Sequence, residues 1–351
     1  MKEVIFVSNV IGNGGAGRVM AIIADYFAEK GVDVTLCSFL DNYETYEMNP
    51  KIKQVIIKKD LKGALGKIQR ISRLRKFIKK HPNATLIAFE HFVNMETIAA
   101  AVGLKNKVIV SERNSPDILD KRKVSKILRD ILYRYTNVLV CQTPEAKEYF
   151  SECVRKKSVI IPNPIKSDLP YYQGERKKEI TTFCRVEKQK NLKMLIDAFE
   201  MLSKDYDEYV LSIYGDGSQK ESLIEYTKEK GLENKVLFQP FIMDIHNKIA
   251  DCEMFVSTSD YEGLSNSMLE AMGMGLPVVC TDCDGGGARM MIENKVNGIL
   301  THKGDTTAFY NGMKYLLDNP DDAKKMSIKA MEVNETLSVD NICSKWLDLT
   351  V

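Results

Sequence analysis

Two glutamates set eight positions apart are the residues of this chain whose spacing most directly suggests chemistry. Glu262 and Glu270 flank a polar turn over 263–267, which follows an apolar strand over 254–256. The pattern after the turn predicts a helix over 267–274. The N–H groups at such a helix start suit a phosphate, and carboxylates beside it suit sugar hydroxyls as hydrogen-bond donors. The alternative is that both acids only favour a helix start, where negative charge is stabilising anyway.

The segment around these glutamates resembles family 4 of the retaining glycosyltransferases, which have the GT-B fold and a Glu-x7-Glu signature. The run over 271–279 and the later Asn297-Gly298 pair resemble the same family pattern. In that family the first glutamate faces the donor sugar and the second holds the ribose of the nucleotide. The resemblance implies these roles for Glu262 and Glu270. It also implies amides that contact phosphate or sugar at four donor-binding positions: Gly263, Leu264, Ser265 and Asn266.

A loop earlier in the same half supplies two cations. The run over 183–191 resembles the family's "GR…KN" element, with Cys184 where glycine is usual. The resemblance implies that Arg185 and Lys190 clamp the nucleotide diphosphate and act in catalysis together with Glu262. Negative charge builds on the diphosphate as the anomeric bond breaks, and fixed cations stabilise it. The family loop that packs on the nucleobase implies two further donor contacts: Phe241 and Ile242.

The glycine-rich run over 12–17 is open to two interpretations. It fits G-x-G-x-x-G after a strand, and Asp41 lies where a ribose-binding acid would be expected, which favours a nicotinamide dinucleotide. The glycines come later than a tight Rossmann turn allows, however, and 14–18 resembles the family's "GGAERV" element with Gly17 in place of glutamate. We favour the transferase, in which Gly15 brings backbone close to the donor phosphate or the acceptor.

Two other loops of the first half resemble acceptor-binding loops. Glu90 and Asn94 lie in a stretch similar to that of relatives which extend lipid-linked oligosaccharides, so both are expected to face the acceptor. The run over 111–116 replaces a histidine that many relatives carry near the reaction centre. Arg113 and Asn114 are candidates for contact with the acceptor or the donor sugar, and the sequence leaves their roles open.

Alternating strands and amphipathic helices must position these loops. Strands are expected at 4–7, 34–39, 86–89, 108–111 and 138–141, and again at 180–183, 209–214, 236–238, 254–256 and 277–280. Two such series predict an α/β protein with two doubly wound parallel sheets, which the resemblance makes a GT-B enzyme of two Rossmann-like domains facing a central cleft. The expected parts are an acceptor-binding domain (1–165), a linker (166–178), a nucleotide-sugar-binding domain (179–335), and a C-terminal helix (336–351) packing back toward the first domain.

Composition and cysteine use favour a cytoplasmic enzyme without a metal. The chain has 351 residues, 44% hydrophobic and 28% charged, as in a globular protein of two domains. Its apolar runs are short of a membrane span, and no cleavable signal follows Met1. Eight scattered cysteines fit a reducing compartment.

No metal or other cofactor is expected, because the Cys280/Cys283 and Asp282/Asp284 pairs stand alone. The four histidines also lack ligand spacing: His81, His91, His246 and His302.

Charge divides the chain in two. The formal net charge of +2 combines +11 over 1–168 (29 basic less 18 acidic residues) with −9 over the rest (21 less 30). A basic half suits an anionic membrane surface or a diphosphate-bearing acceptor, although it also helps the halves close on each other. The segment 61–80 predicts an amphipathic helix with a basic face that includes Arg70, Arg73, Lys76 and Lys80, and a second basic cluster spans 121–129. Either the apolar stripe of 61–80 packs on the protein's own sheet, or the basic face docks on anionic lipid.

Together these features predict a retaining glycosyltransferase. It would move a hexose or N-acetylhexosamine from a nucleotide sugar, with UDP favoured, to a saccharide acceptor on a polyprenyl diphosphate, at the inner face of the cell membrane. No nucleic-acid partner is expected. The alternatives are an epimerase or phosphorylase on the same fold, or a non-catalytic nucleotide-sugar-binding protein. The sequence does not specify the sugar, the linkage or the acceptor.

Overall fold

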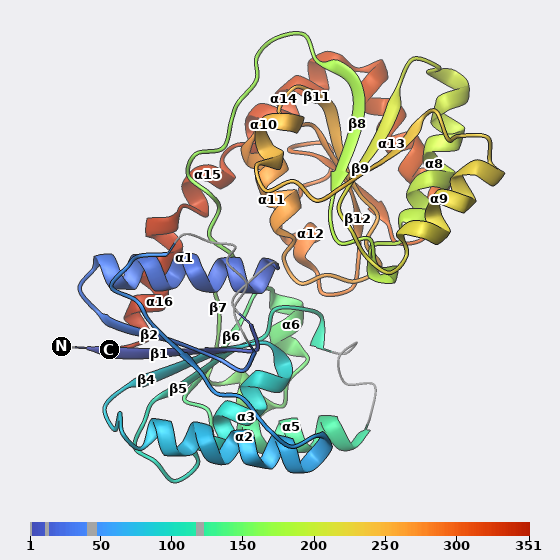
Figure 1. Cartoon of the computed structure of the whole chain (residues 1–351). Helices are drawn as coiled ribbons and strands as arrows, with labels where there is room; N and C mark the ends of the chain where they lie inside the picture. The colour runs from blue at the N-terminus through green and yellow to red at the C-terminus, as the bar shows by residue number, and fades with distance from the viewer. Residues whose placement is uncertain (1, 11–13, 41–47, 117–122) are drawn as a thin grey trace. The chain divides into compact units, whose positions relative to one another are not determined.

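The chain forms two compact units in a computed structural model (Figure 1) that describes residues 2–10, 14–40, 48–116 and 123–351. Unit 1 comprises residues 1–164 and 339–351, and unit 2 comprises 165–338. The segment 166–178, expected as a linker, therefore belongs to unit 2 and leads into its first strand. Gly12, Asn13 and Asp41, which carried the dinucleotide alternative, lie outside the described residues, as do Lys121 and Arg122.

Unit 1 is built on a seven-stranded sheet in the order β3-β2-β1-β4-β5-β6-β7, with every neighbouring pair parallel. The two outermost strands, β3 and β7, were not predicted, because β3 is a short, largely exposed edge strand and β7 has only three residues. The strands are β1 (Glu3–Ser8), β2 (Asp33–Ser38), β3 (Lys53–Ile56), β4 (Thr85–Phe89), β5 (Val108–Ser111), β6 (Val138–Cys141) and β7 (Ser158–Ile160).

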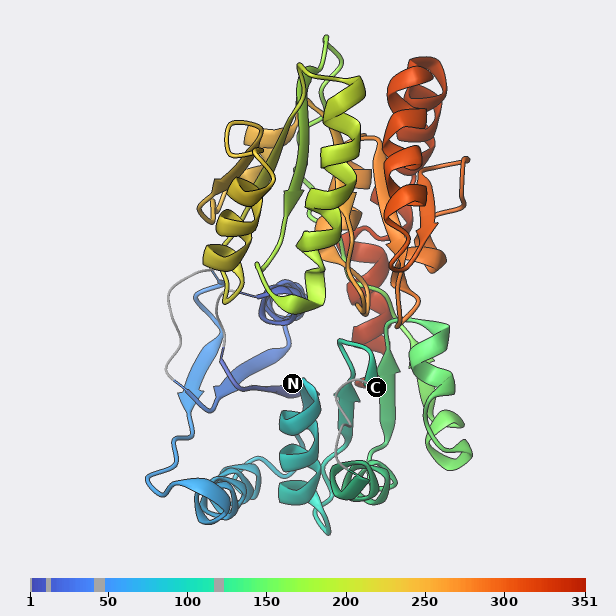
Figure 2. The ribbon, with the colours of Figure 1, turned by 90° about the vertical axis from the view of Figure 1, so that its right-hand side faces the viewer.

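Helices cover both faces of this sheet. Figures 1 and 2 show α1 (Gly15–Glu29) and α16 (Val339–Asp348) on one face, and α2 (Gly63–Ile78), α3 (His91–Ala101) and α5 (Lys123–Tyr133) on the other. The last helix thus returns to unit 1, where its fully buried Trp346 packs against Phe89 with ring centroids 5.3 Å apart. Two short helices, α6 (Pro144–Glu148) and α7 (Glu152–Arg155), flank β6 and β7.

Unit 2 repeats the plan with six parallel strands in the order β10-β9-β8-β11-β12-β13. These are β8 (Lys177–Phe183), β9 (Val210–Tyr214), β10 (Val236–Gln239), β11 (Cys252–Ser257), β12 (Val278–Asp282) and β13 (Ile299–His302). Its helices are α8 (Leu192–Asp205), α9 (Lys220–Glu229), α10 (Ile245–Ile249), α11 (Asn266–Gly273), α12 (Gly287–Met291), α13 (Thr306–Asp318), α14 (Pro320–Ala330) and α15 (Val333–Thr336), with a 3-10 turn, η1 (Lys188–Lys190).

The strand orders fix where loops can form a site. In each sheet the chain first builds outward on one side and then crosses to the other, at β1/β4 in unit 1 and at β8/β11 in unit 2. Loops leaving the carboxyl ends of two such strands diverge, and the crevice between them is where open α/β sheets bind ligands. The predicted donor residues follow β8 and β11, and Gly15 and Glu90 follow β1 and β4.

The orientation of α2 differs from the prediction. Leu74 and Ile78 are buried, but Leu65 and Ile68 of the same predicted stripe are 66% and 63% exposed. Arg70, expected on the solvated basic face, is buried instead. Its Nε donates to Oε2 of Glu96 at 2.6 Å, and its guanidinium lies 4.3 Å from the centre of the Phe39 ring. This ion pair with α3 draws the polar edge of α2 inward. No helix in the described ranges is both long and apolar enough to cross a bilayer.

We predict that Trp346→Ala destabilises unit 1 by about 3–5 kcal/mol, the usual cost of emptying a large buried aromatic site. The loss should appear as an earlier unfolding transition of the full chain, followed by circular dichroism in a denaturant titration. Trp346→Phe is the control, since it keeps an aromatic ring against Phe89 and should cost markedly less. Equal stability of the alanine variant and the wild type would contradict the packing role of α16.

Candidate active site

In unit 2 the loops after β8 and β11 are bonded to each other. The backbone N–H of Asp260 donates to the carbonyl of Gln189 at 2.9 Å, and the side-chain amide of Gln189 donates to the carbonyl of Tyr261 at 2.8 Å. Thr258 donates its hydroxyl to the carbonyls of Lys190 and Asn191 at 3.0 and 3.2 Å. The two loops therefore act as one rigid rim at the switch point of the sheet.

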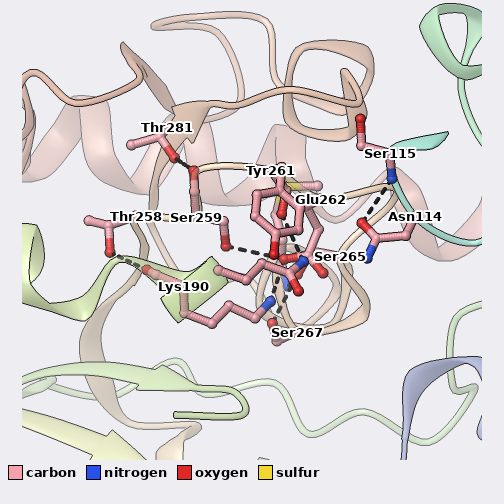
Figure 3. Close-up of polar contacts among 12 residues, drawn as sticks. Asn114, Ser115, Lys190, Thr258, Ser259, Tyr261, Glu262, Ser265, Ser267 and Thr281 are labelled. Atoms are coloured by element: carbon pink, nitrogen blue, oxygen red, sulfur yellow. Dashed lines mark hydrogen bonds and ion pairs between the residues drawn. The ribbon is translucent and has the colours of Figure 1, made fainter. Parts of the chain in front are cut away.

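At the centre of this rim Lys190 forms an ion pair with Glu262 (Figure 3). The hydroxyl of Ser259 donates to the same carboxylate oxygen at 3.1 Å, and both charged side chains are largely buried, 11% and 21% exposed. Burial lowers the pKa of Lys190, but the charge and hydrogen bond of Glu262, together with the nearby Cys184, outweigh this effect, so the net pKa lies above the ordinary value. A lysine with a raised pKa is charged at all pH values below its ordinary pKa, so Lys190 is a fixed cation at neutral pH.

Arg185 lies beside this pair on a loop held by the Gly215–Gly217 turn. The N–H of Cys184 donates to the carbonyl of Tyr214 at 3.0 Å, and the N–H of Val186 donates to that of Asp216 at 2.9 Å. A Cβ at either glycine would lie within 2.0–2.3 Å of a carbonyl oxygen of this loop, so no larger residue fits. The guanidinium of Arg185 is exposed and forms no ion pair within the described residues. It is therefore available to an anion.

The helix α11 begins at Asn266, one residue earlier than predicted. Ser265 caps it, because its hydroxyl accepts from the N–H of Met268 at 3.4 Å. Leu264 is buried and anchors the turn. Gly263 is approached so closely by Gly287 that a Cβ on Gly287 would lie 1.8 Å from its carbonyl oxygen. The expected donor-binding positions 263–266 therefore form a packed turn that leads into the N-terminus of α11.

Glu270 lies one turn inside α11 and is buried, 2% exposed. The Nε2 atom of His246, also buried, lies 2.9 Å from its Oε2. A carboxylate accepts hydrogen bonds, so Nε2 is the donor of this contact. The ring of His246 packs edge-on against Phe183, with centroids 6.1 Å apart. Sequence reasoning missed this partner, since the histidine lies 24 positions before the glutamate with no spacing rule to connect them.

The predicted nucleobase loop is open to solvent. Phe241 is 57% exposed, and Ile242 is half-buried. The N–H of Phe241 donates to a carboxylate oxygen of Asp216 at 3.1 Å, which ties this loop to the glycine turn that supports Arg185. An exposed aromatic ring on a fixed backbone is a suitable stacking surface for a flat ligand.

In unit 1 the residues expected to bind acceptor differ in accessibility. Glu90 has a left-handed backbone, with φ of 78°, a strained conformation that non-glycine residues keep mainly at functional sites. Burial raises the pKa of its carboxyl. Asn94, by contrast, is fully buried and does not face solvent. Its amide nitrogen donates to the carbonyl of Ser111 at 2.9 Å and to the hydroxyl of Tyr133 at 3.1 Å, so the predicted contact of this amide with an acceptor is not supported.

Arg113 and Asn114 follow β5. The guanidinium of Arg113 lies 4.6 Å from the centre of the Phe89 ring and donates to the side chain of Asn163. Burial lowers its pKa to about 9, so it stays charged at neutral pH. Asn114 uses its side-chain oxygen to accept from the N–H of Ser115 at 2.8 Å, which shapes the loop (Figure 3).

Glu112, between β5 and Arg113, was not predicted as a site residue. It is buried, accepts from the hydroxyl of Tyr133, and lies 3.3 Å from Nδ1 of His91. Burial, together with the contact with Glu112, raises the pKa of Tyr133 well above its usual range. These side chains come from α3, α5 and the loop after β5, so only the tertiary fold brings them together.

Comparison with known proteins identifies the family. The model for "Glycosyl transferases group 1" matches residues 172–333, and that for "Glycosyltransferase Family 4" matches residues 13–169. The chain belongs to glycosyltransferase family 4. It is therefore a glycosyltransferase, an enzyme that uses nucleotide sugars.

Relatives match over almost the whole length of this glycosyltransferase. An uncharacterized glycosyltransferase of Haemophilus influenzae is 26% identical over 99% of both chains. An N-acetylgalactosaminyltransferase of Campylobacter jejuni, named for an undecaprenol-diphosphate-linked saccharide, is 23% identical over 99% of this chain and 98% of its own. The crystal structure of Anabaena HepE in complex with UDP superposes with a TM-score of 0.85 at 18% identity, covering 99% of both chains. The predicted GT-B fold is thus confirmed.

Within the described residues of the glycosyltransferase no three metal-binding side chains cluster. Asp282 forms an ion pair with Arg289, and Asp284 forms one with Lys303, so both acids already have cationic partners. All eight cysteines are free thiols. Burial raises the pKa of Cys283 to about 12. A thiol of such high pKa is a poor metal ligand, because metals bind the thiolate.

We predict that Lys190 and Glu262 are energetically coupled. Lys190→Met and Glu262→Gln should each lower the free energy of unfolding by roughly 1–3 kcal/mol, because each leaves the other group poorly paired. The double variant should lose less than the sum, by at least about 1 kcal/mol. The same cycle on the more exposed pair Lys303–Asp284 is the control and should give a coupling below about 1 kcal/mol. Additive losses at Lys190 and Glu262, measured in denaturant titrations, would show that the buried pair is not coupled.

Proposed function

We propose that this glycosyltransferase moves a hexose or N-acetylhexosamine from a UDP-activated donor to a saccharide acceptor, with retention of anomeric configuration. The observation that carries the proposal is the convergence of Arg185, Lys190 and Glu262 at the β8/β11 switch point, beside the N-terminus of α11. The UDP complex of the structurally similar HepE supports UDP as the nucleotide.

In this proposal the cations act on the leaving group. The bond between the anomeric carbon and the diphosphate oxygen breaks, the acceptor oxygen bonds to the same carbon, and the acceptor proton passes to the leaving phosphate oxygen. Arg185 and Lys190 balance the charge that develops on the diphosphate, and the N–H groups that begin α11 add to it. Glu262 keeps Lys190 in place, and its carboxylate is near enough to this centre to accept from a donor-sugar hydroxyl.

We propose that two protein cations take the place of a metal ion in this reaction. Lys190 is charged at neutral pH, and the guanidinium of Arg185 is exposed. In unit 1, we propose the strained Glu90 and the loop of Arg113 and Asn114 as acceptor contacts, while Gly15 at the start of α1 would approach the donor.

The proposed acceptor is a saccharide on a polyprenyl diphosphate, and the proposed place of work is the inner face of the cell membrane. The Campylobacter jejuni relative supports this acceptor class through its name. An epimerase or phosphorylase would act on the nucleotide sugar without a second sugar, and a binding protein would turn nothing over. Product analysis with a UDP-sugar and an undecaprenyl-diphosphate-linked saccharide separates the three: only transfer lengthens the acceptor.

We predict that Arg185→Ala lowers kcat/KM by at least about thirtyfold, which corresponds to a loss of about 2 kcal/mol of transition-state stabilisation. Lys188→Ala is the matched control, since this lysine is exposed on the same loop and should be near neutral. Steady-state transfer assays, with and without EDTA, give both results. Normal turnover of Arg185→Ala would rule out the diphosphate clamp, and a strict need for a divalent ion would rule out the metal-free mechanism.

We predict that His246 orients Glu270 toward the ribose of the nucleotide. His246→Phe keeps the edge contact with Phe183 but removes the N–H donor, so UDP binding should weaken about tenfold, as expected for a lost hydrogen bond to a charged group. Binding of 2′-deoxy-UDP should weaken much less, because it lacks one of the hydroxyls that Glu270 would hold.

His246→Gln should restore the preference for UDP over 2′-deoxy-UDP, because its amide places a hydrogen-bond donor where Nε2 lies. Calorimetric titration of both nucleotides measures the preference, and Glu270→Ala should abolish it. If Glu270→Ala leaves the preference intact, the ribose role of Glu270 is wrong. If Glu270→Ala abolishes it and His246→Phe does not, His246 has no positioning role.

A further inference from the structure

Helix α5 turns its apolar stripe toward solvent. Val124, Ile127, Leu128 and Ile131 recur at three- and four-residue spacing and are 77%, 59%, 49% and 48% exposed. We refer to these four residues as the α5 stripe. The inward side of the same helix instead carries Arg129, which is fully buried. In a soluble helix the apolar stripe normally faces the core.

Aromatic rings and an ion pair hold α5 in this orientation. The guanidinium of Arg129 lies 4.9 Å from the ring centre of Phe150 and 5.0 Å from that of Tyr149, and it pairs with Asp130 at 2.6 Å. Tyr133, also on the inward side, is fully buried and stacks on Phe150 at 5.8 Å. The outward stripe is therefore a stable feature of the packed unit.

The two other helices of this layer also expose apolar side chains. Leu65 and Ile68 of α2 are 66% and 63% exposed, and Phe92 at the start of α3 is 53% exposed. The ammonium of Lys67 on α2 lies 5.3 Å from the centre of the Phe92 ring, which joins these two helices at the surface. The α5 stripe together with Leu65, Ile68 and Phe92 is called the docking face below.

The docking face lies on one layer and toward one edge of unit 1. Helices α2, α3 and α5 cover the same side of the sheet (Figures 1 and 2). Helices α2 and α3 follow parallel strands, so their first turns lie at the carboxyl edge of the sheet. Glu90 and Arg113, the proposed acceptor contacts, follow strands at this same edge.

Charge around the docking face distinguishes its possible occupants. Lys67 and Lys126 are exposed on α2 and α5, and Lys62 is exposed just before α2. The nearby acids Asp60, Glu96 and Asp130 pair with Arg73, Arg70 and Arg129. Lysine is depleted in the cores of protein interfaces, and a second copy of the chain would bring like charges together. Apolar side chains fringed by lysine are typical of helices that lie in the interface of an anionic membrane.

We infer that the docking face inserts its apolar side chains into an anionic phospholipid bilayer while the surrounding lysines contact the headgroups. The inference deepens the proposed function, on which it rests for its purpose: the surface that meets the membrane lies at the edge of unit 1 that carries the acceptor residues. Both contributions are needed. Lysines alone would give binding that salt abolishes, whereas inserted Ile and Leu side chains give a component that salt does not screen.

Co-sedimentation of the full chain with vesicles tests this inference. Vesicles of phosphatidylglycerol and phosphatidylcholine should bind the wild type at low salt, and phosphatidylcholine alone should bind it at least about tenfold more weakly. Ile127→Gln with Leu128→Gln should lower binding at least about tenfold and remove what persists at high salt. Lys62→Gln, Lys67→Gln and Lys126→Gln together should lower low-salt binding by a similar factor.

Matched substitutions elsewhere provide the controls. Lys76→Gln, Lys79→Gln and Lys80→Gln remove the same charge at the other end of α2, and Val102→Gln with Ile328→Gln removes exposed apolar side chains outside the docking face. Both sets should bind nearly as the wild type does.

Equal losses in the control and docking-face variants, or no vesicle binding by the wild type, would overturn the inference. A dimer in sedimentation equilibrium that Ile127→Gln with Leu128→Gln dissociates would assign the face to a second copy instead. Hydrolysis of the UDP-sugar without acceptor should be unchanged in all variants, so a failure of the proposed reaction is detected separately.

Discussion

The ion pair between Lys190 and Glu262 is the interaction on which the candidate active site depends. The two residues lie 72 positions apart, and they meet only because β8 and β11 are neighbours whose carboxyl ends point the same way. The backbone hydrogen bond from Asp260 to Gln189 keeps the two loops in register around the pair. A buried ammonium without its carboxylate is costly, so the fold and the charge arrangement support each other. Preorganised charge of this kind needs no rearrangement as the reaction proceeds.

Close backbone approaches explain why the loops around this pair can be so compact. Gly215 and Gly217 let the chain pass directly beneath the loop that carries Arg185, and Gly287 does the same beneath Gly263. In each case a Cβ would meet a backbone atom, which cannot move aside as a side chain can. The glycines of the Gly215–Gly217 turn therefore act through space on a neighbouring loop. They position the Arg185 loop through backbone contacts.

Sequence patterns predicted what local periodicity and short motifs encode. The central strands of both sheets are apolar runs that must be buried on two faces, and the donor loops are contiguous segments with their own signature. Contacts that only the tertiary fold creates could not be predicted from the sequence. His246 and Glu270 lie on different helices, and Glu112 meets Tyr133 and His91 only once α3 and α5 pack together. Edge strand β3 was missed because an exposed edge needs no apolar run. Asn94 was expected to be accessible to an acceptor, but it is fully buried. A polar residue soon after a strand gives the same sequence pattern whether it faces solvent or a buried hydrogen-bond network.

Helices α2 and α5 show why amphipathic periodicity alone does not determine which side of a helix is buried. Each contains an apolar stripe, yet each buries an arginine, Arg70 against Glu96 and Arg129 against aromatic rings. A guanidinium that is paired and stacked tolerates burial, whereas the exposed leucines and isoleucines forgo roughly 25 cal/mol for every Å² of apolar area left in water. Helices α2 and α5, which lie on either side of α3, share this arrangement in one layer of unit 1. The isolated chain lacks this hydrophobic free energy, and it would gain it only where that layer meets an apolar phase. The outward apolar stripes and buried arginines of α2 and α5 thus link the packing of unit 1 to the environment in which a lipid-linked acceptor would be presented.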